Sequence, residues 1–120
     1  MGIDPKELPT KLLLAEHREI KRIPNTIKSG KAKITGIPDS FTLGVGHVKF
    51  FYDKLLFLKN RYLSIYEECI NRQCNVQSYI ESFEELPIRL LNDYNVTNHD
   101  RQLLIDRIES KGFKLITGIE

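Results

Sequence analysis

Residues 48–72, VKFFYDKLLFLKNRYLSIYEECINR, decide the fold. Largely apolar side chains recur there at alternating intervals of three and four residues, which places them on one stripe of an α-helix. They are Val48, Phe51, Leu55, Leu58, Tyr62, Ile65 and Cys69. This pattern predicts one long helix that reaches Arg72 and acts as the central scaffold, with Cys69 as a small core residue.

A second helix is predicted before this segment. It begins near Asp4 or Thr10 and runs to about Ile27, and Gly30 provides its C-terminal stop. Pro24 should kink or interrupt the helix, because proline lacks a backbone N–H donor.

A third helix is predicted near the end of the chain. Thr97 is a good N-cap, and Asp100 stands at capping-box spacing from it. The helix should end at Gly112, and the apolar tail at 113–116 should pack back on the body.

The remaining segments predict irregular connections. Residues 31–42 contain a glycine and a proline, residues 78–83 are compatible with strand or loop, and Pro87 can begin a brief helix through Leu91. The glycines of 44–46 are expected to shape the entry to the central helix. The fold class expected is mainly α: a compact single domain over residues 1–120, with about three helices around one core.

The composition excludes several classes of protein. Among 120 residues, 18 basic and 16 acidic side chains give a net charge of +2, which excludes a histone-like polycation and an acidic tail. No apolar run approaches the roughly 20 residues of a membrane span, and the start has no signal-peptide pattern. Cys69 and Cys74 supply neither a disulfide framework nor a zinc site. We therefore expect a cytoplasmic protein with reduced thiols, without metal or membrane.

One carboxylate falls on an apolar stripe of the first predicted helix. Leu12, Ala15, Glu19 and Ile23 recur at helical spacing, so Glu19 lies in line with apolar neighbours. A carboxylate there needs a cation, a hydrogen-bond donor or a water-filled cleft, because an unpaired buried charge is costly.

Two arginines flank this glutamate. Arg18 and Arg22 stand four residues apart and repel each other unless an anion such as a phosphate bridges them. The alternative is that Glu19 pairs with Arg22 on a solvated face.

Basic residues concentrate in the first third of the chain. They include Lys11, Arg18, Lys21, Arg22, Lys28, Lys31 and Lys33. A near-neutral total charge can hide a basic face that binds nucleic acid, although a solvated helix with mixed charges fits the same pattern.

Two stretches resemble a known enzyme family. Residues 14–20, LAEHREI, look like the catalytic helix of the phage and viral pyrimidine-dimer DNA glycosylases of the endonuclease V type. Residues 41–55, FTLGVGHVKFFYDKL, are similar to that family's longest shared block. The likeness extends from Leu8 to Arg107.

The resemblance implies a compact three-helix DNA repair glycosylase with AP-lyase activity on ultraviolet photoproducts, without metal or cofactor. In that family an N-terminal α-amine attacks C1′ and releases the base as a Schiff base forms. A glutamate of the first helix supports this step and the β-elimination that breaks the strand. An amine suits the task because its ordinary pKa, near 8, leaves a neutral fraction at physiological pH. Enzymes of that family kink the DNA and extrude a nucleotide, as other base-flipping enzymes do.

Site residues follow from the resemblance position by position. Glu19 matches the catalytic glutamate, and Arg18 and Arg22 match arginines that hold DNA phosphates. Further candidates for binding DNA are His17, Lys31, Lys33 and Arg107. The family's nucleophile is the amine of a threonine after the initiator methionine, whereas removal of Met1 here would leave the amine on Gly2.

The chain departs from the family pattern in ways that support other hypotheses. Leu12 stands where the best-known members have histidine, His17 where they have tyrosine, and the aromatic–basic C-terminal cluster is reduced to Phe113 and Lys114. A second hypothesis is therefore a non-catalytic relative that binds DNA or a nucleotide-like ligand in the same cleft. A third, a structural or interaction role, rests only on the stripe of the central helix. The expected partner is damaged double-stranded DNA or a nucleotide-like small molecule, in the cytoplasm of a bacterium or an infected cell.

Overall fold

Helices account for the regular secondary structure in the computed structural model, which describes residues 1–43 and 47–116. The α-helices are α1 (Thr10–Glu19), α2 (Arg22–Lys28), α3 (Leu55–Asn71) and α4 (Asn98–Ser110). Short 3₁₀ turns lie at Pro5–Glu7, Lys49–Phe51, Ile80–Phe83 and Ile88–Leu90. The predicted mainly α class is confirmed. Within the described ranges, no helix combines the length and the apolar character needed to cross a membrane.

The apolar stripe of the central helix is confirmed, but the helix begins later than predicted. Its buried side chains are Leu55, Leu58, Tyr62, Ile65 and Cys69. Residues 48–51 belong instead to a separate turn, and the side chain of Val48 is 45% exposed.

A distant residue explains this late start. Asn92 accepts a hydrogen bond from the backbone N–H of Phe57, and its side chain donates to the carbonyl of Asp53. These bonds satisfy backbone groups on either side of the helix start, where helix geometry leaves them unpaired. The tertiary contact overrides the local periodicity.

The first predicted helix is interrupted, as expected from its proline. α1 ends at Glu19 and α2 begins at Arg22, so Pro24 lies in the first turn of α2, where a missing N–H is tolerated. Gly30 follows the end of α2 with φ of +75°, the conformation of a helix stop that glycine adopts without strain.

The predicted capping box of α4 is confirmed. The Thr97 hydroxyl accepts from the Asp100 N–H at 3.0 Å, and the Asp100 carboxylate accepts from the Thr97 N–H at 3.1 Å. Gly112 follows the helix with φ of +85°. The tail packs back as expected, since the N–H of Ile116 donates to the Glu7 carbonyl at 2.7 Å.

The connections also follow the prediction in part. The described residues of 31–42 form no helix, and Pro87 precedes a 3₁₀ turn. Residues 80–83, expected as strand or loop, form a 3₁₀ turn instead, with Phe83 buried. The predicted role of the glycines at 44–46 lies outside the described residues.

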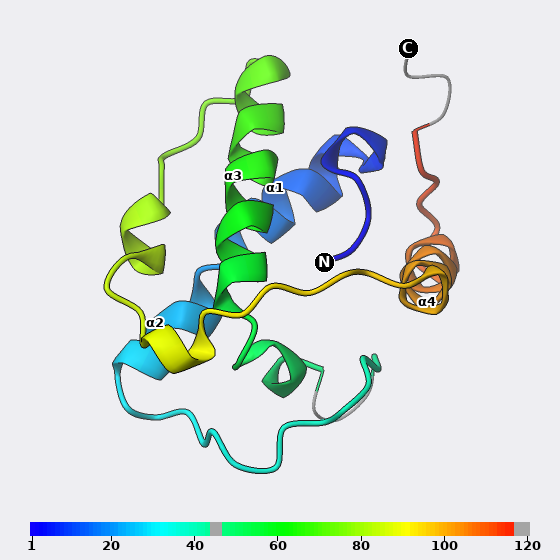
Figure 1. The fold of residues 1–120 in the computed structure, drawn as a ribbon. Helices are drawn as coiled ribbons and strands as arrows, with labels where there is room; N and C mark the ends of the chain where they lie inside the picture. Colours follow the sequence, from blue (N-terminus) through cyan, green and yellow to red (C-terminus); the bar gives the residue numbers. More distant parts are fainter. Residues whose placement is uncertain (44–46, 117–120) are drawn as a thin grey trace.

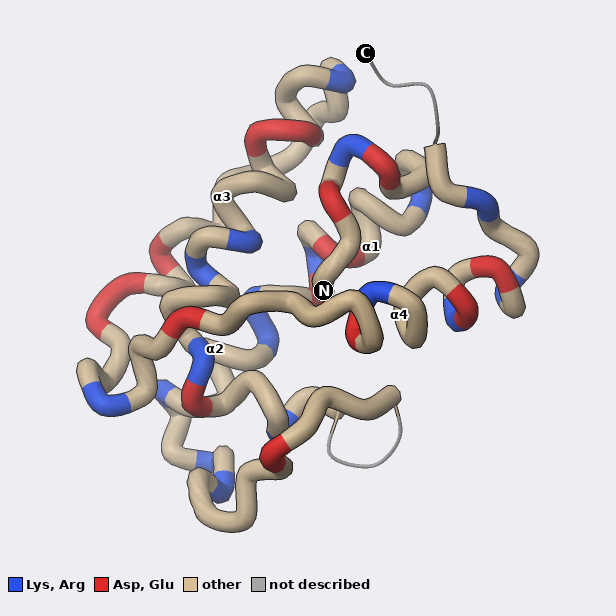
Figure 2. Tube along the Cα trace, turned by 45° about the vertical axis from the view of Figure 1, so that its right-hand side comes forward, with Lys and Arg blue, Asp and Glu red and all other residues tan. Residues whose placement is uncertain are grey.

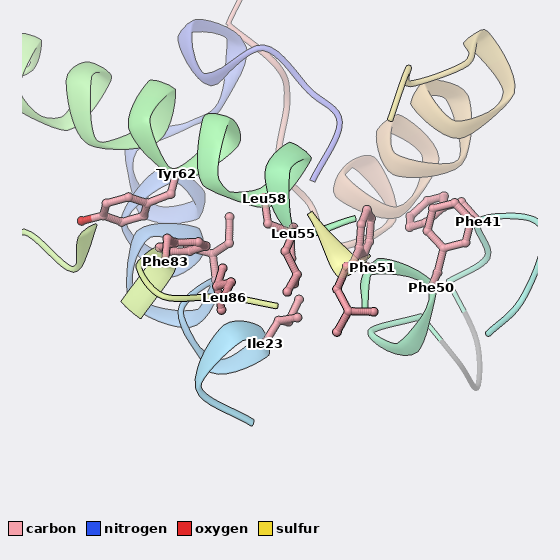
Figure 3. Packing of buried hydrophobic residues seen from close by; sticks show 11 residues of the cluster. Ile23, Phe41, Phe50, Phe51, Leu55, Leu58, Tyr62, Phe83 and Leu86 are labelled. Carbon is pink, nitrogen blue, oxygen red and sulfur yellow. The ribbon is translucent and has the colours of Figure 1, made fainter. Parts of the chain in front are cut away.

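The core consists of two adjoining clusters rather than the single one expected. The larger contains Leu55, Leu58 and Tyr62 of α3 together with aromatic side chains of neighbouring segments (Figure 3). The smaller joins Ile65 and Cys69 of the same helix to the N-terminal segment and α1. α3 therefore contributes to both clusters, and α1 packs against it (Figure 1). The segment before α4 crosses the molecule from near α2 (Figure 1).

Candidate functional site

A cavity of about 470 Å³ lies between the N-terminal segment, α1, the start of α2, α3 and α4. This volume is in the range of small-molecule and substrate sites. Its titratable lining includes Met1, Glu16, Glu19, Arg22, His47 and Arg61. The cavity thus gathers an α-amine, two carboxylates, two guanidinium groups and an imidazole.

Two faces of α1 explain how the sequence builds this cavity. Leu13, His17 and Ile20 recur at helical spacing and are buried. The stripe that contains Ala15 and Glu19 lines the cavity instead. Helical spacing predicts Glu19 in line with apolar neighbours, but its side chain is 52% exposed because that face borders an opening rather than the core.

Glu19 and Arg22 lie at the accessible part of the cavity. Their closest charged atoms, Oε1 and Nη1, are 3.9 Å apart, and the Arg22 side chain is 69% exposed. Such an exposed pair contributes little to stability, so both groups remain available to a substrate. Arg18 is exposed on α1 but does not line the cavity, so the two arginines do not converge on it.

Glu16 and Arg61 form a buried pair deeper in the cavity. The Arg61 Nε and Nη2 groups donate to the two carboxylate oxygens at 2.7 and 3.1 Å. Arg61 Nη1 also donates to the carbonyl of Ile3. The side chains are 8% and 16% exposed for Arg61 and Glu16. Burial raises the pKa of Glu16, but the charges of Arg61 and the α-amine, with the hydrogen bonds, hold it below its ordinary value.

The α-amine of Met1 faces the same surroundings. Burial lowers the pKa of this amine, the Glu16 charge raises it, and the Arg61 charge lowers it further, with a net lowering. A lowered pKa increases the fraction of amine that is neutral, and therefore nucleophilic, near neutral pH.

Gly2, the sequence-predicted position of the amine, lies outside this cavity. It lines a smaller cavity of about 340 Å³ with Phe57 and Val96. A Cβ on Gly2 would stand 2.9 Å from Leu104 Cδ1, so the backbone is packed closely against α4 there. Met1, unlike Gly2, lines the main cavity.

His47 also lines the cavity. The Nε2 atom of His47 is buried and has no hydrogen-bond partner among residues 1–43 and 47–116. Burial lowers the pKa of His47, and the charges of the α-amine and Arg107 lower it further. Arg107 itself is exposed on α4.

His17 lies in the core, away from the cavity lining. Its Nε2 atom is 3.1 Å from the Tyr62 hydroxyl, which also accepts a hydrogen bond of 2.6 Å from the backbone N–H of Tyr79. Burial lowers the pKa of His17. A hydrogen bond with the Gln77 backbone raises this pKa and the charge of Lys21 lowers it, and the net effect is a lowering. The geometry gives His17 a packing role rather than contact with DNA.

The remaining basic candidates are solvent-exposed. Lys31 and Lys33 follow α2 in the connection to the central helix. Figure 2 shows basic segments along α2 and this connection. Neither lysine lines the cavity.

Glu16, His47 and Arg61 were not predicted from the sequence as site residues. A signal for Arg61 was present, because it stands three residues after Leu58 and four before Ile65, beside the buried stripe. Among the described residues, no cluster of three or more histidine, cysteine or acidic side chains could hold a metal ion.

One comparison with known proteins bears on this site. A family model described as pyrimidine dimer DNA glycosylase matches residues 2–82. The matched part contains α1, α2 and α3, and with them Glu16, Glu19, Arg22, His47 and Arg61.

Proposed function

From the premise that this chain belongs to the pyrimidine dimer DNA glycosylase family, we propose that it excises damaged pyrimidines and cleaves the strand through a Schiff base on its α-amine. Membership of the family supports DNA repair and the binding of damaged DNA. The observation that carries the finer mechanism is the buried α-amine of Met1 in one cavity with two carboxylates.

The chemistry begins with the neutral amine. Its nitrogen forms a bond to C1′ while the glycosidic bond breaks, and the electron pair leaves with the base, which takes up a proton. Opening of the sugar ring then gives a C1′=N iminium group. Loss of a proton from C2′ expels the 3′-phosphate, and hydrolysis releases the amine.

Glu19 is the carboxylate that we assign to this chemistry. It lines the cavity and is half exposed, so it can reach both a bound sugar and water. A carboxylate there stabilises the developing cationic sugar and moves protons. Arg22 is placed to hold a phosphate at the same opening. The exposed basic residues Arg18, Lys31, Lys33 and Arg107 would extend this grip along the backbone.

The test is borohydride trapping with duplex DNA that carries one abasic site. We expect a covalent complex, and mass spectrometry of its peptides should place the sugar on the N-terminal residue, Met1, or Gly2 where Met1 has been removed. Undamaged duplex is the control. Absence of the complex, or attachment to Lys111, which also lines the cavity, would contradict the proposed nucleophile.

A role in binding a nucleotide-like ligand without catalysis is the second candidate. The observation in its favour is the size of the cavity together with the Glu19–Arg22 pair at its opening. Calorimetry with mononucleotides distinguishes it, because such binding should be tight and depend little on salt, whereas binding of duplex DNA weakens steeply as salt rises.

A further inference from the structure

Arg61 of α3 and Arg72, the residue that directly follows this helix, hold the N-terminal arm, by which we mean residues 1–9. Arg61 donates to the carbonyl of Ile3, near the start of the arm. Arg72 donates to the carbonyls of Leu8 at 2.7 Å and Pro5 at 3.0 Å, near its end. The arm is therefore fixed at two places, once within α3 and once just after its C-terminal end.

Each arginine is held in turn by a glutamate. Arg61 pairs with Glu16, and Arg72 pairs with Glu68, both with an Nε–Oε2 distance of 2.7 Å. In all four residues the side chain is at most 16% exposed. The two pairs thus match in chemistry and burial, although Arg61 also donates to the second carboxylate oxygen of Glu16.

The pairs differ in what lies beside them. Glu16 and Arg61 line the cavity, where their charges act on the α-amine of Met1. Glu68 and Arg72 do not line it. Only the first pair, therefore, is placed to affect both the position of the amine and its charge.

We propose that Glu16 and Arg61 form a positioning pair for the attacking amine: Arg61 anchors the arm through the Ile3 carbonyl, and Glu16 holds the guanidinium and balances its charge. This inference rests on the proposed function, because it assigns a task in that reaction. Neither residue reacts with the substrate; both act through the amine.

The opposite charges of the pair affect the protonation of the α-amine in a way that packing alone would not. Glu16 stabilises the protonated amine and Arg61 destabilises it, so removing either charge changes the amine in opposite directions. The other charged or titratable groups around this cavity are Glu19, Arg22, His47 and Lys111. They are unchanged in both variants and so form a constant background.

The experiment measures how readily the α-amine reacts with a small acylating reagent across pH, read by mass spectrometry of the N-terminal peptide. Glu16→Gln should move the midpoint of this profile to lower pH and Arg61→Met to higher pH, each by about half a pH unit or more. Glu68→Gln is the matched control and should not move it. Shifts in the same direction, or none beyond the control, overturn the proposal.

A double variant guards against loss of the fold. Removing Glu16 alone leaves the Arg61 charge buried without its partner, which is destabilising. The Glu16→Gln/Arg61→Met variant removes both charges, so its midpoint should return toward that of the unaltered protein. A midpoint that stays displaced would mean that the charges do not act as a balanced pair.

Trapping separates this inference from the proposed function. At saturating abasic DNA, Arg61→Met should trap more slowly with unchanged DNA affinity, because the arm has lost an anchor near the amine. If the unaltered protein traps no complex, the proposed function fails, whatever the acylation profiles show. If it traps the complex and the profiles do not move apart, the positioning pair alone fails.

Discussion

Glu16 and Glu19, one turn apart on α1, have opposite environments. Glu16 is bound through both oxygens by Arg61, and its lowered pKa keeps it ionised. Glu19 has only a 3.9 Å contact with Arg22 and is half exposed. A proton-transfer group must exchange partners during a reaction, and Glu19 is the freer of the two. The structure therefore separates a fixed carboxylate from an available one.

This separation predicts different outcomes for the two side chains. Glu19→Gln should change the free energy of unfolding by no more than about 0.5 kcal/mol, since the site is exposed. It should slow single-turnover cleavage of abasic DNA about 10²-fold or more, with DNA affinity retained. Glu16→Ala should instead cost about 3–5 kcal/mol of stability, because it leaves a buried guanidinium unpaired. Urea unfolding and single-turnover kinetics measure both effects.

Glu67→Gln on the exposed face of α3 is the control for a loss of one negative charge. If Glu19→Gln cleaves as fast as this control, the proton-transfer role belongs to another group.

The sequence could predict one of these residues and not the other. Glu19 stood out because helical spacing within α1 placed a charge among apolar residues. The partner of Glu16 lies 45 residues away, at a distance over which helical spacing carries no information. The α-amine enters the cavity through the tertiary contacts of the N-terminal arm, which local patterns do not encode.

At the scale of the elements, some helix ends could be predicted from local sequence and others are determined by distant contacts. The start of α4 was predictable because its capping box is made by residues three apart. The start of α3 was not, because Asn92 supplies the hydrogen bonds around it from a distant part of the chain. Caps made within one helix can be read from sequence, and caps made by another segment cannot.

The capping box predicts the stability of α4. Thr97→Ala removes the side-chain acceptor for the Asp100 N–H and should lower the free energy of unfolding by about 0.5–2 kcal/mol. Thr97→Ser keeps the hydroxyl and is the matched control. Urea unfolding monitored by circular dichroism measures both. Equal stability of the alanine and serine variants would show that the cap contributes nothing to the fold.

At the scale of the whole molecule, buried titratable groups predict how stability changes with acidity. Burial lowers the pKa values of the α-amine, His17 and His47 below their ordinary values of 8.0, 6.5 and 6.5. The unfolded chain therefore binds more protons as the pH falls below about 8, and again below about 6.5, and the free energy of unfolding decreases. Glu16 and Asp100, with lowered pKa values, add a loss in the same direction at more acid pH.

At alkaline pH, buried acidic groups make the free energy of unfolding decrease as the pH rises. Burial raises the pKa values of Cys69 and Tyr62, and burial with the Asp100 hydrogen bond raises the pKa of Tyr94 to about 12. Above about pH 9 the unfolded chain loses these protons first, so stability falls again. Urea unfolding from pH 5 to 11 should show a maximum near pH 8–9. Tyr94→Phe should flatten the alkaline limb, and a maximum below pH 7 would contradict the balance of buried groups.

The distribution of charge predicts how the molecule binds DNA. The net charge of +2 conceals basic residues along α1, α2 and the connection that follows (Figure 2). Most of them are exposed. Each phosphate neutralised releases counterions, so the logarithm of the DNA binding constant should fall linearly with the logarithm of salt concentration. Arg22→Ala should reduce the magnitude of that slope by about 1.

A matched control variant and a second ligand test this prediction. Lys6 is exposed in the part of the arm held by Arg72 and does not line the cavity, so Lys6→Ala removes an equal charge and should leave the slope unchanged. A mononucleotide releases few counterions, so its binding should respond little to salt in any variant. Equal slopes for Arg22→Ala and Lys6→Ala would mean that DNA does not lie across the opening. The cavity would then be reached only by a small ligand, and the repair mechanism would lose its substrate.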